Sequence, residues 1–159
     1  MIEIPITKGA IALIDDEDYE KIKNHSWCWH GDGYAARGYH QNGRIVIEKM
    51  HHVIIGKAPK GMVVDHINGN KLDNRRCNLR FVTIQQNAFN SEKKTYNRQV
   101  SSQYKGVYWR RNRNKWTSYI TVNGKKHYLG LFVNEKDAAE AYNKAAKRLH
   151  GEYAKLNQI

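Results

Sequence analysis

Residues 63–70 read VVDHINGN and place Asp65 and His66 at the end of an apolar run, directly before an Asn-Gly turn. An apolar run that stops at a turn signal is typical of a strand with a buried face. The segment therefore predicts a strand that ends on a carboxylate and an imidazole, two groups able to act together in catalysis.

A second strand and a helix follow this pair. Residues 78–82, NLRFV, predict a strand, and Thr83 with Gln86 three positions later forms a capping box. A helix is therefore expected to begin there, with Asn87 in its first turns. The two strands and the helix carry four polar side chains within 23 positions: Asp65, His66, Asn78 and Asn87.

The segments DHINGN, NLRFVT and QQN resemble the ββα-metal motif of HNH endonucleases, in the branch that has asparagine where the last histidine often stands. The spacings agree with that branch, with 12 positions from His66 to Asn78 and 21 from His66 to Asn87. The resemblance implies that His66 is a general base, that Asn78 orients it, and that Asp65 and Asn87 hold one divalent metal ion. Phage and mobile-element proteins of the homing type carry similar sequences.

The chemistry of phosphodiester hydrolysis explains these residue types. A neutral imidazole can take the proton of the attacking water, and a metal ion stabilises transition-state charge as a Lewis acid. The oxygen ligands of Asp65 and Asn87 suit Mg²⁺ or Mn²⁺, one ion per active site, completed by waters and DNA phosphate. Taken singly, each residue is better explained as turn, loop or helix-surface chemistry, but their joint spacing favours the nuclease.

Other histidines and arginines flank the motif. His51 and His52 precede an apolar stretch that we interpret as a strand, and we expect them to be structural or to contact phosphate. Arg75, Arg76 and Arg80 are stronger candidates for phosphate contacts, although a solvated loop could also hold them.

Residues 1–50 predict a β-rich extension of the nuclease region. Short apolar runs alternate with polar turns such as Asn42-Gly43, and one helical turn is expected at Asp18–Lys23. The strands expected here are 11–14, 27–29, 34–39 and 44–47.

Residues 104–159 predict three strands and a helix. Strands are expected at 104–110, 116–122 and 126–132, with Asn123-Gly124 as a two-residue hairpin turn. From Glu135 onward, apolar residues recur at helical spacing and predict a face that packs on the sheet. This stripe comprises Ala138, Ala139, Tyr142, Ala145, Ala146 and Leu149.

The segments YKGVYWRR, KWTSYI, YLGLF, EKDAAEAYNKAA and GEYAKLN resemble, in order, the plant AP-two/ethylene-response-factor domain. That domain lays a three-stranded sheet in the DNA major groove. Strand alternation also predicts an outward face of the sheet. If Val107, Ile120 and Leu129 face the helix, their neighbours along each strand face away from it.

The outward face differs from the plant pattern in having few arginines. Recognition of guanine by arginine is limited mainly to Arg110, with Arg111 or Arg113, so the target sequence is not carried over. The residues of this module expected to contact DNA are Tyr108, Arg110, Arg111, Arg113, Tyr119, Lys126 and Tyr128.

The net charge of +12 is unevenly distributed. Residues 1–50 carry 6 basic against 8 acidic side chains, residues 51–100 carry 9 against 3, and residues 101–159 carry 12 against 4. A basic excess attracts a polyanion, although solubility alone also explains one. Aromatics among the basic residues near the C-terminus favour nucleic acid.

Other features exclude several protein classes. The two cysteines, without a CxxC pair, indicate neither a disulfide framework nor a cysteine-built zinc site. No signal peptide is recognisable, and no apolar run approaches the ~20 residues that a membrane span needs. We expect a cytoplasmic protein, a monomer, with no membrane partner and no small-molecule substrate.

The sequence therefore predicts an α+β chain with a ββα-metal nuclease module at 51–90 and its β-rich extension at 1–50. A linker at 91–103 is expected to join it to an AP-two-like domain at 104–159, a three-stranded antiparallel sheet packed on one helix. The expected function is metal-dependent nicking of double-stranded DNA. The alternative is a non-catalytic DNA-binding regulator on a retained HNH scaffold. RNA as substrate is disfavoured, because the A-form major groove does not admit a sheet.

Overall fold

The computed structural model describes residues 1–93 and 101–159, which form two compact units, Met1–Ile84 and Gln85–Ile159. Residues 94–100 of the predicted linker lie outside the described residues. This segment includes the basic residues Lys94 and Arg98. Helices and small antiparallel sheets are mixed along the chain, which is compatible with the predicted α+β class. Within the described ranges, no helix has both the length and the apolarity that crossing a bilayer requires.

The first 49 residues form two small antiparallel sheets, as the alternation of apolar runs and turns predicts. The hairpin at Asn42-Gly43 is present, and both residues have positive φ angles, 51° and 73°, as this turn type requires. The elements are β1 (Ile2–Pro5), β2 (Ile11–Ile14), α1 (Tyr19–Ile22), β3 (Cys28–Trp29), β4 (Ala35–Gln41) and β5 (Arg44–Lys49).

The interpretation of the stretch after His51-His52 as a strand is wrong. Met50–Ile55 is a short helix, α2, which ends at Gly56 with φ 85°. Met50 and Ile54 lie one helical turn apart and are both buried in the core of the first unit. Burial of this i, i+4 pair favours a helix over the strand that the apolar run alone suggests.

The predicted strand pair of the motif is confirmed. β6 (Met62–His66) pairs antiparallel with β7 (Leu79–Thr83), with Asp65 opposite Arg80 and His66 opposite Leu79. Val64 and Leu79 are buried with residues of the N-terminal extension. The extension and the strand pair therefore share one hydrophobic core.

The N-terminal extension also holds the loop between β6 and β7. The Leu13 N–H donates to the Leu72 carbonyl, and the Asn74 N–H donates to the Leu13 carbonyl, both at 2.8 Å. Farther along the loop, the Arg76 guanidinium donates to both carboxylate oxygens of Asp18 at 2.7 Å. Asp18 is fully buried, whereas the Arg76 side chain is 41% exposed, so this ion pair joins the loop to a buried carboxylate of the extension.

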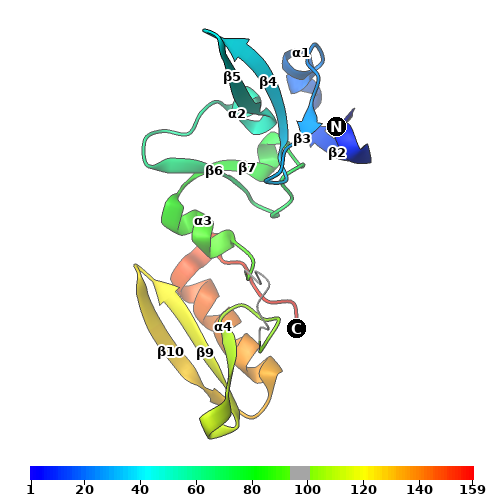
Figure 1. Cartoon of the computed structure of the whole chain (residues 1–159). Helices are drawn as coiled ribbons and strands as arrows, with labels where there is room; N and C mark the ends of the chain where they lie inside the picture. Colours follow the sequence, from blue (N-terminus) through cyan, green and yellow to red (C-terminus); the bar gives the residue numbers. More distant parts are fainter. Residues whose placement is uncertain (94–100) are drawn as a thin grey trace. The chain divides into compact units, whose positions relative to one another are not determined.

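The second unit contains the predicted sheet and helix, preceded by α3 (Ile84–Asn90), of which all but Ile84 belongs to this unit. Strands β8 (Val107–Arg110), β9 (Lys115–Val122) and β10 (Lys125–Phe132) form a sheet in the order β10-β9-β8. Helix α4 (Glu135–His150) lies across one face of this sheet (Figure 1). The Asn123-Gly124 turn has the predicted positive φ angles, 51° and 73°.

The predicted apolar stripe on α4 is confirmed except at its end. Its alanines and Tyr142 are buried against Val107 and Ile120 of the sheet. Leu149 is 38% exposed, however, and His150 is buried in its place. The buried position suits His150 because its ring Nε2 lies 3.2 Å from the Thr121 carbonyl oxygen of β9.

Gly106 provides a test of the packing between sheet and α4. It has φ +78°, and a Cβ there would lie 2.5 Å from the Tyr119 carbonyl oxygen and against the Tyr142 ring. Gly106→Ala should lower the free energy of unfolding of the second unit by about 2 kcal/mol or more, from backbone strain and overpacking together. Urea unfolding followed by tryptophan fluorescence measures this change.

The matched control is Gly124→Ala. Gly124 also has a positive φ, +73°, but open space surrounds its missing Cβ. Its substitution should cost only the strain, about 1 kcal/mol. Equal losses for the two variants would contradict the role of close packing at Gly106.

Candidate active site

The end of β6 brings Asp65 and His66 into a buried cluster of polar groups. Their exposed fractions are 5% and 4%. A tight turn follows, in which the Gly69 N–H donates to the His66 carbonyl at 2.8 Å and the Ile67 N–H donates to the Asn78 carbonyl at 2.9 Å. The structure thus brings together three of the predicted site residues, Asp65, His66 and Asn78, within one strand pair.

The side chain of Asn78 closes the loop between the two strands. Its Oδ1 accepts a hydrogen bond from the Asn68 backbone N–H at 2.9 Å, and its Nδ2 donates to the Asp73 carbonyl at 2.8 Å. The amide therefore holds the backbone on both sides of the loop. Orientation of the His66 ring by Asn78 stays a prediction.

Asn74 is a partner of His66 that the sequence analysis missed. Asn74 is buried, and its Oδ1 lies 3.4 Å from His66 Nε2. Its Nδ2 donates to the Leu72 carbonyl at 3.1 Å, so Oδ1 is the atom left to face the ring and Nε2 is the donor. The only signal in the sequence is an Asp-Asn pair within a polar loop, which is common in proteins.

The surroundings of His66 favour the neutral ring. Burial lowers the pKa of His66 below its ordinary value, against the opposing effects of the Asn74 hydrogen bond and the Asp65 and Asp73 charges. A neutral imidazole has one nitrogen with a free electron pair for a proton. The role of His66 as a general base stays a prediction.

Aromatic rings surround His66 on further sides. Tyr34 and His51 lie with their ring centroids 5.6 Å and 5.2 Å from that of His66, and 5.1 Å from each other. His51 is buried, and burial lowers its pKa to about 3. Of the two roles expected for His51, this burial supports the structural one.

Two lysines stand over the Tyr34 ring, a feature that the sequence analysis missed. The Nζ atoms of Lys49 and Lys71 lie 4.0 Å and 4.7 Å from the ring centroid. Both also bond to Asp32, Lys49 to its carboxylate and Lys71 to its carbonyl oxygen, each at 2.6 Å. Although burial opposes the change, hydrogen bonds from Lys49 and His30 lower the pKa of Asp32 to about 2.

The three arginines expected at phosphate all bond to carboxylates of this chain. Arg80 Nε donates to Asp65 Oδ2 at 2.9 Å. Arg75 donates to both carboxylate oxygens of Asp73 at 2.7 Å, as Arg76 does to Asp18. Their predicted phosphate contacts stay predictions, and each guanidinium has a defined role within the fold.

The residues predicted to hold a metal come from both units. Asp65 ends β6 in the first unit, whereas Asn87 lies half-buried in α3 of the second. Among the described residues, no group of three or more His, Cys, Asp or Glu side chains is arranged to hold a metal ion. One carboxylate and one amide oxygen fit magnesium, which keeps several water or phosphate ligands.

Four of the seven residues predicted to contact DNA in the second unit gather on the face of the sheet opposite α4. Tyr108 and Tyr128 are 43% and 54% exposed, and both pack against Tyr119, with centroid distances of 6.5 Å and 5.5 Å. Lys126 Nζ stands 5.0 Å from the Tyr108 centroid and 4.1 Å from that of Tyr119. The face thus combines aromatic rings with a cation, as the alternation of the strands predicts.

The three arginines of this module lie at one end of the sheet. Arg110 ends β8, and Arg111 and Arg113 belong to the short 3-10 helix that follows. All three side chains are exposed. The turn returns to β9 through Asn114, whose φ of 49° is left-handed.

Comparison with known proteins agrees with this geometry. Residues 44–89 match the family model described as HNH endonuclease. Over 62 residues, 39% of this chain and 13% of the other, the chain is also 43% identical to AP2-like ethylene-responsive transcription factor TOE2 from Arabidopsis thaliana.

Two viral proteins are similar over most of their own length. The chain is 32% identical to the protein named Uncharacterized HNH endonuclease L560, from Acanthamoeba polyphaga mimivirus, over 96% of this chain and 77% of that protein. It is 32% identical to Protein 3.8 from Escherichia phage T7, over 64% of this chain and 80% of that protein. The chain therefore belongs to the HNH endonuclease family.

Proposed function

We propose that the protein is a metal-dependent endonuclease that nicks double-stranded DNA, with His66 as the general base. The observation that carries the proposal is the burial of His66 at the end of β6, next to Asp65 in the chain, where burial lowers the pKa of its ring. Membership of the HNH endonuclease family supports the same chemistry. The homing type is part of the proposal, since the similar proteins include viral ones.

In the proposed reaction, water attacks the phosphorus atom and the bond from phosphorus to the 3′ oxygen breaks. His66 takes the proton of the attacking water. Asn74 holds the ring through Nε2, and Asn78 holds the loop that carries Asn74. These two amides fix the position of the base, and a fixed base needs little reorganisation to reach the water.

Asp65 and Asn87 would hold one Mg²⁺ or Mn²⁺ ion. When bound, the ion would stabilise the charge that develops on the phosphate and the leaving oxygen. Arg80 Nε donates to Oδ2 of Asp65, and this bond would hold the carboxylate in one orientation as a ligand.

The second unit would supply affinity for DNA. Its sheet face offers Tyr108, Tyr119, Tyr128 and Lys126, with Arg110 at its end. The 43% identity to part of a plant protein named as a transcription factor supports a DNA-binding role for this segment. A single active site per chain favours nicking of one strand by a monomer.

Supercoiled plasmid tests the activity directly. We expect the purified protein to convert it to nicked circles in magnesium or manganese, and to leave it supercoiled in a chelator. Agarose gels measure the conversion. Cutting in the chelator, or none with any divalent ion and any DNA, would falsify the proposed activity.

Removal of the base separates chemistry from binding. His66→Ala should slow nicking by ~10²-fold or more, with DNA affinity nearly unchanged, because a general base acts on the chemical step. Single-turnover nicking and fluorescence anisotropy measure the two quantities. His40→Ala, at an exposed position of β4, is the control and should keep the parental rate; a parental rate in His66→Ala would exclude His66 as the base.

Arg110 tests sequence recognition by the second unit. On a preferred site selected from random DNA, Arg110→Ala should cost about 1–3 kcal/mol of binding free energy and relax the preference at one position, if the guanidinium contacts a guanine. Arg148→Ala removes the same charge from an exposed position of α4 and should have a smaller effect. A uniform loss on all sequences would instead indicate that Arg110 contacts phosphate.

A further inference from the structure

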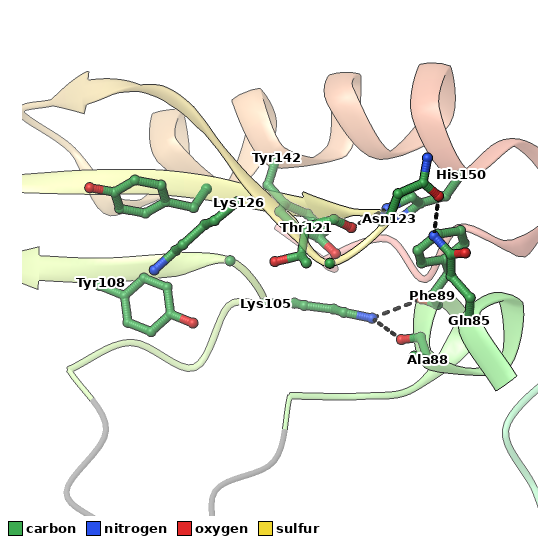
Figure 2. Close-up of a pocket in the computed structure, with 13 residues that line it drawn as sticks. Gln85, Ala88, Phe89, Lys105, Tyr108, Thr121, Asn123, Lys126, Tyr142 and His150 are labelled. Atoms are coloured by element: carbon green, nitrogen blue, oxygen red, sulfur yellow. Dashed lines mark hydrogen bonds between the residues drawn. The ribbon is translucent and has the colours of Figure 1, made fainter.

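Helix α3, which carries Asn87, is anchored at its C-terminal end by a lysine of the second unit. Lys105 Nζ donates to the backbone carbonyls of Ala88 at 3.3 Å, Phe89 at 2.8 Å and Ser91 at 2.5 Å, and Figure 2 shows the first two bonds. The last carbonyls of a helix have no partner within it, and a cation there also opposes the helix dipole. One ammonium group thus satisfies three carbonyls at the end of α3.

All three N–H groups of the Lys105 ammonium are used in these contacts with carbonyl oxygens. Its three N–H donors match the three carbonyls that surround it, so none is left for phosphate. Burial lowers the pKa of Lys105 to about 8, and the Lys155 charge adds to this effect. Loss of water from an ammonium group is costly, and the three bonds offset that cost.

A ring stack holds the same end of the helix. The Phe89 ring lies parallel to that of His150, with centroids 3.7 Å apart and an angle of 7° between the planes. His150 is buried, and burial lowers its pKa below the ordinary value. The His150 ring therefore covers Phe89, two positions after Asn87.

Two more hydrogen bonds join α3 to the rest of the second unit. The Lys155 N–H donates to the Phe89 carbonyl at 3.2 Å. At the other end of the helix, Gln85 Nε2 donates to Asn123 Oδ1 at 2.6 Å, at the tip of the β9–β10 hairpin (Figure 2). Contacts with this unit therefore reach both ends of α3.

These contacts matter because α3 has only seven residues. An isolated helix of that length is not stable in water, since helices shorter than ~12–15 residues are marginal even in favourable sequences. The orientation of Asn87 thus depends on tertiary contacts. The described contacts that supply it come from Lys105, Asn123, His150 and Lys155.

We propose that Lys105 is a positioning residue that acts through α3 to hold Asn87 in the orientation needed for metal binding. The proposal rests on the assignment of Asn87 as a metal ligand under the proposed function. It departs from the predicted architecture, in which the catalytic module ends at residue 90 and a linker follows.

The test measures manganese affinity in the full-length protein bound to duplex DNA. Free Mn²⁺ is followed by electron paramagnetic resonance in a His66→Ala background, which keeps the DNA intact. Adding Lys105→Met removes the three donors but keeps the aliphatic stem, and it should weaken manganese binding roughly tenfold, as loss of an outer-shell partner does. DNA affinity in a chelator should stay that of the background.

Two further variants make the result specific. Lys105→Arg keeps the charge and the donors and should restore most of the manganese affinity. Lys136→Met removes the same charge at an exposed position of α4 and should change nothing. Unchanged manganese affinity in Lys105→Met, or an equal loss in Lys136→Met, overturns the proposal.

Asn87→Ala distinguishes failure of this proposal from failure of the proposed function. If Asn87→Ala leaves manganese affinity unchanged, the assignment of the ligand is wrong, and the positioning role falls with it. If Asn87→Ala weakens the affinity but Lys105→Met does not, only the positioning role is wrong. Should Lys105→Met unfold the second unit, Phe89→Leu replaces it, and parental manganese affinity in that variant overturns the proposal.

Discussion

Burial of the His66 imidazole at the end of β6 is the constraint on which the first unit depends. A buried polar ring is costly unless the chain itself supplies its partners. Asn74 supplies one, and the loop that carries Asn74 is closed by Asn78 and paired to Leu13 of the N-terminal extension. The extension thus supports the site through backbone hydrogen bonds and a shared core, although it contributes no residue to the predicted motif.

Several charged side chains are paired within the folded chain and are therefore less available to DNA than the sequence suggests. The acidic residues of the first unit pair with its arginines, as Asp18 does with Arg76 and Asp65 with Arg80. Lys105 likewise has its ammonium group on backbone carbonyls, and so does Lys93, with three such bonds of 2.8–3.0 Å. A count of basic residues therefore overstates the charge available to DNA, and the exposed arginines after β8 are better placed to attract it.

Helix α3 follows the strand pair directly in sequence, but from Gln85 onward it belongs to the second compact unit. The predicted motif is thus continuous in sequence, but its strands and its helix belong to different compact units. Seven residues are too few for a helix that is stable by itself, so α3 depends on tertiary contacts such as those with Lys105.

The sequence alone determined the elements that local chemistry controls. Asn-Gly turns, strand alternation and the alanine stripe gave β6, β7, the C-terminal sheet and α4, because these signals act over a few neighbouring residues. Only the tertiary structure decided that Met50–Ile55 is helical, that His150 is buried in place of Leu149, and that Asn74 contacts His66. These outcomes depend on partners far away in the chain, such as the buried Asp18 that pairs with Arg76 across 58 positions. Local sequence patterns do not predict such partners, because burial and charge pairing depend on how distant segments pack together.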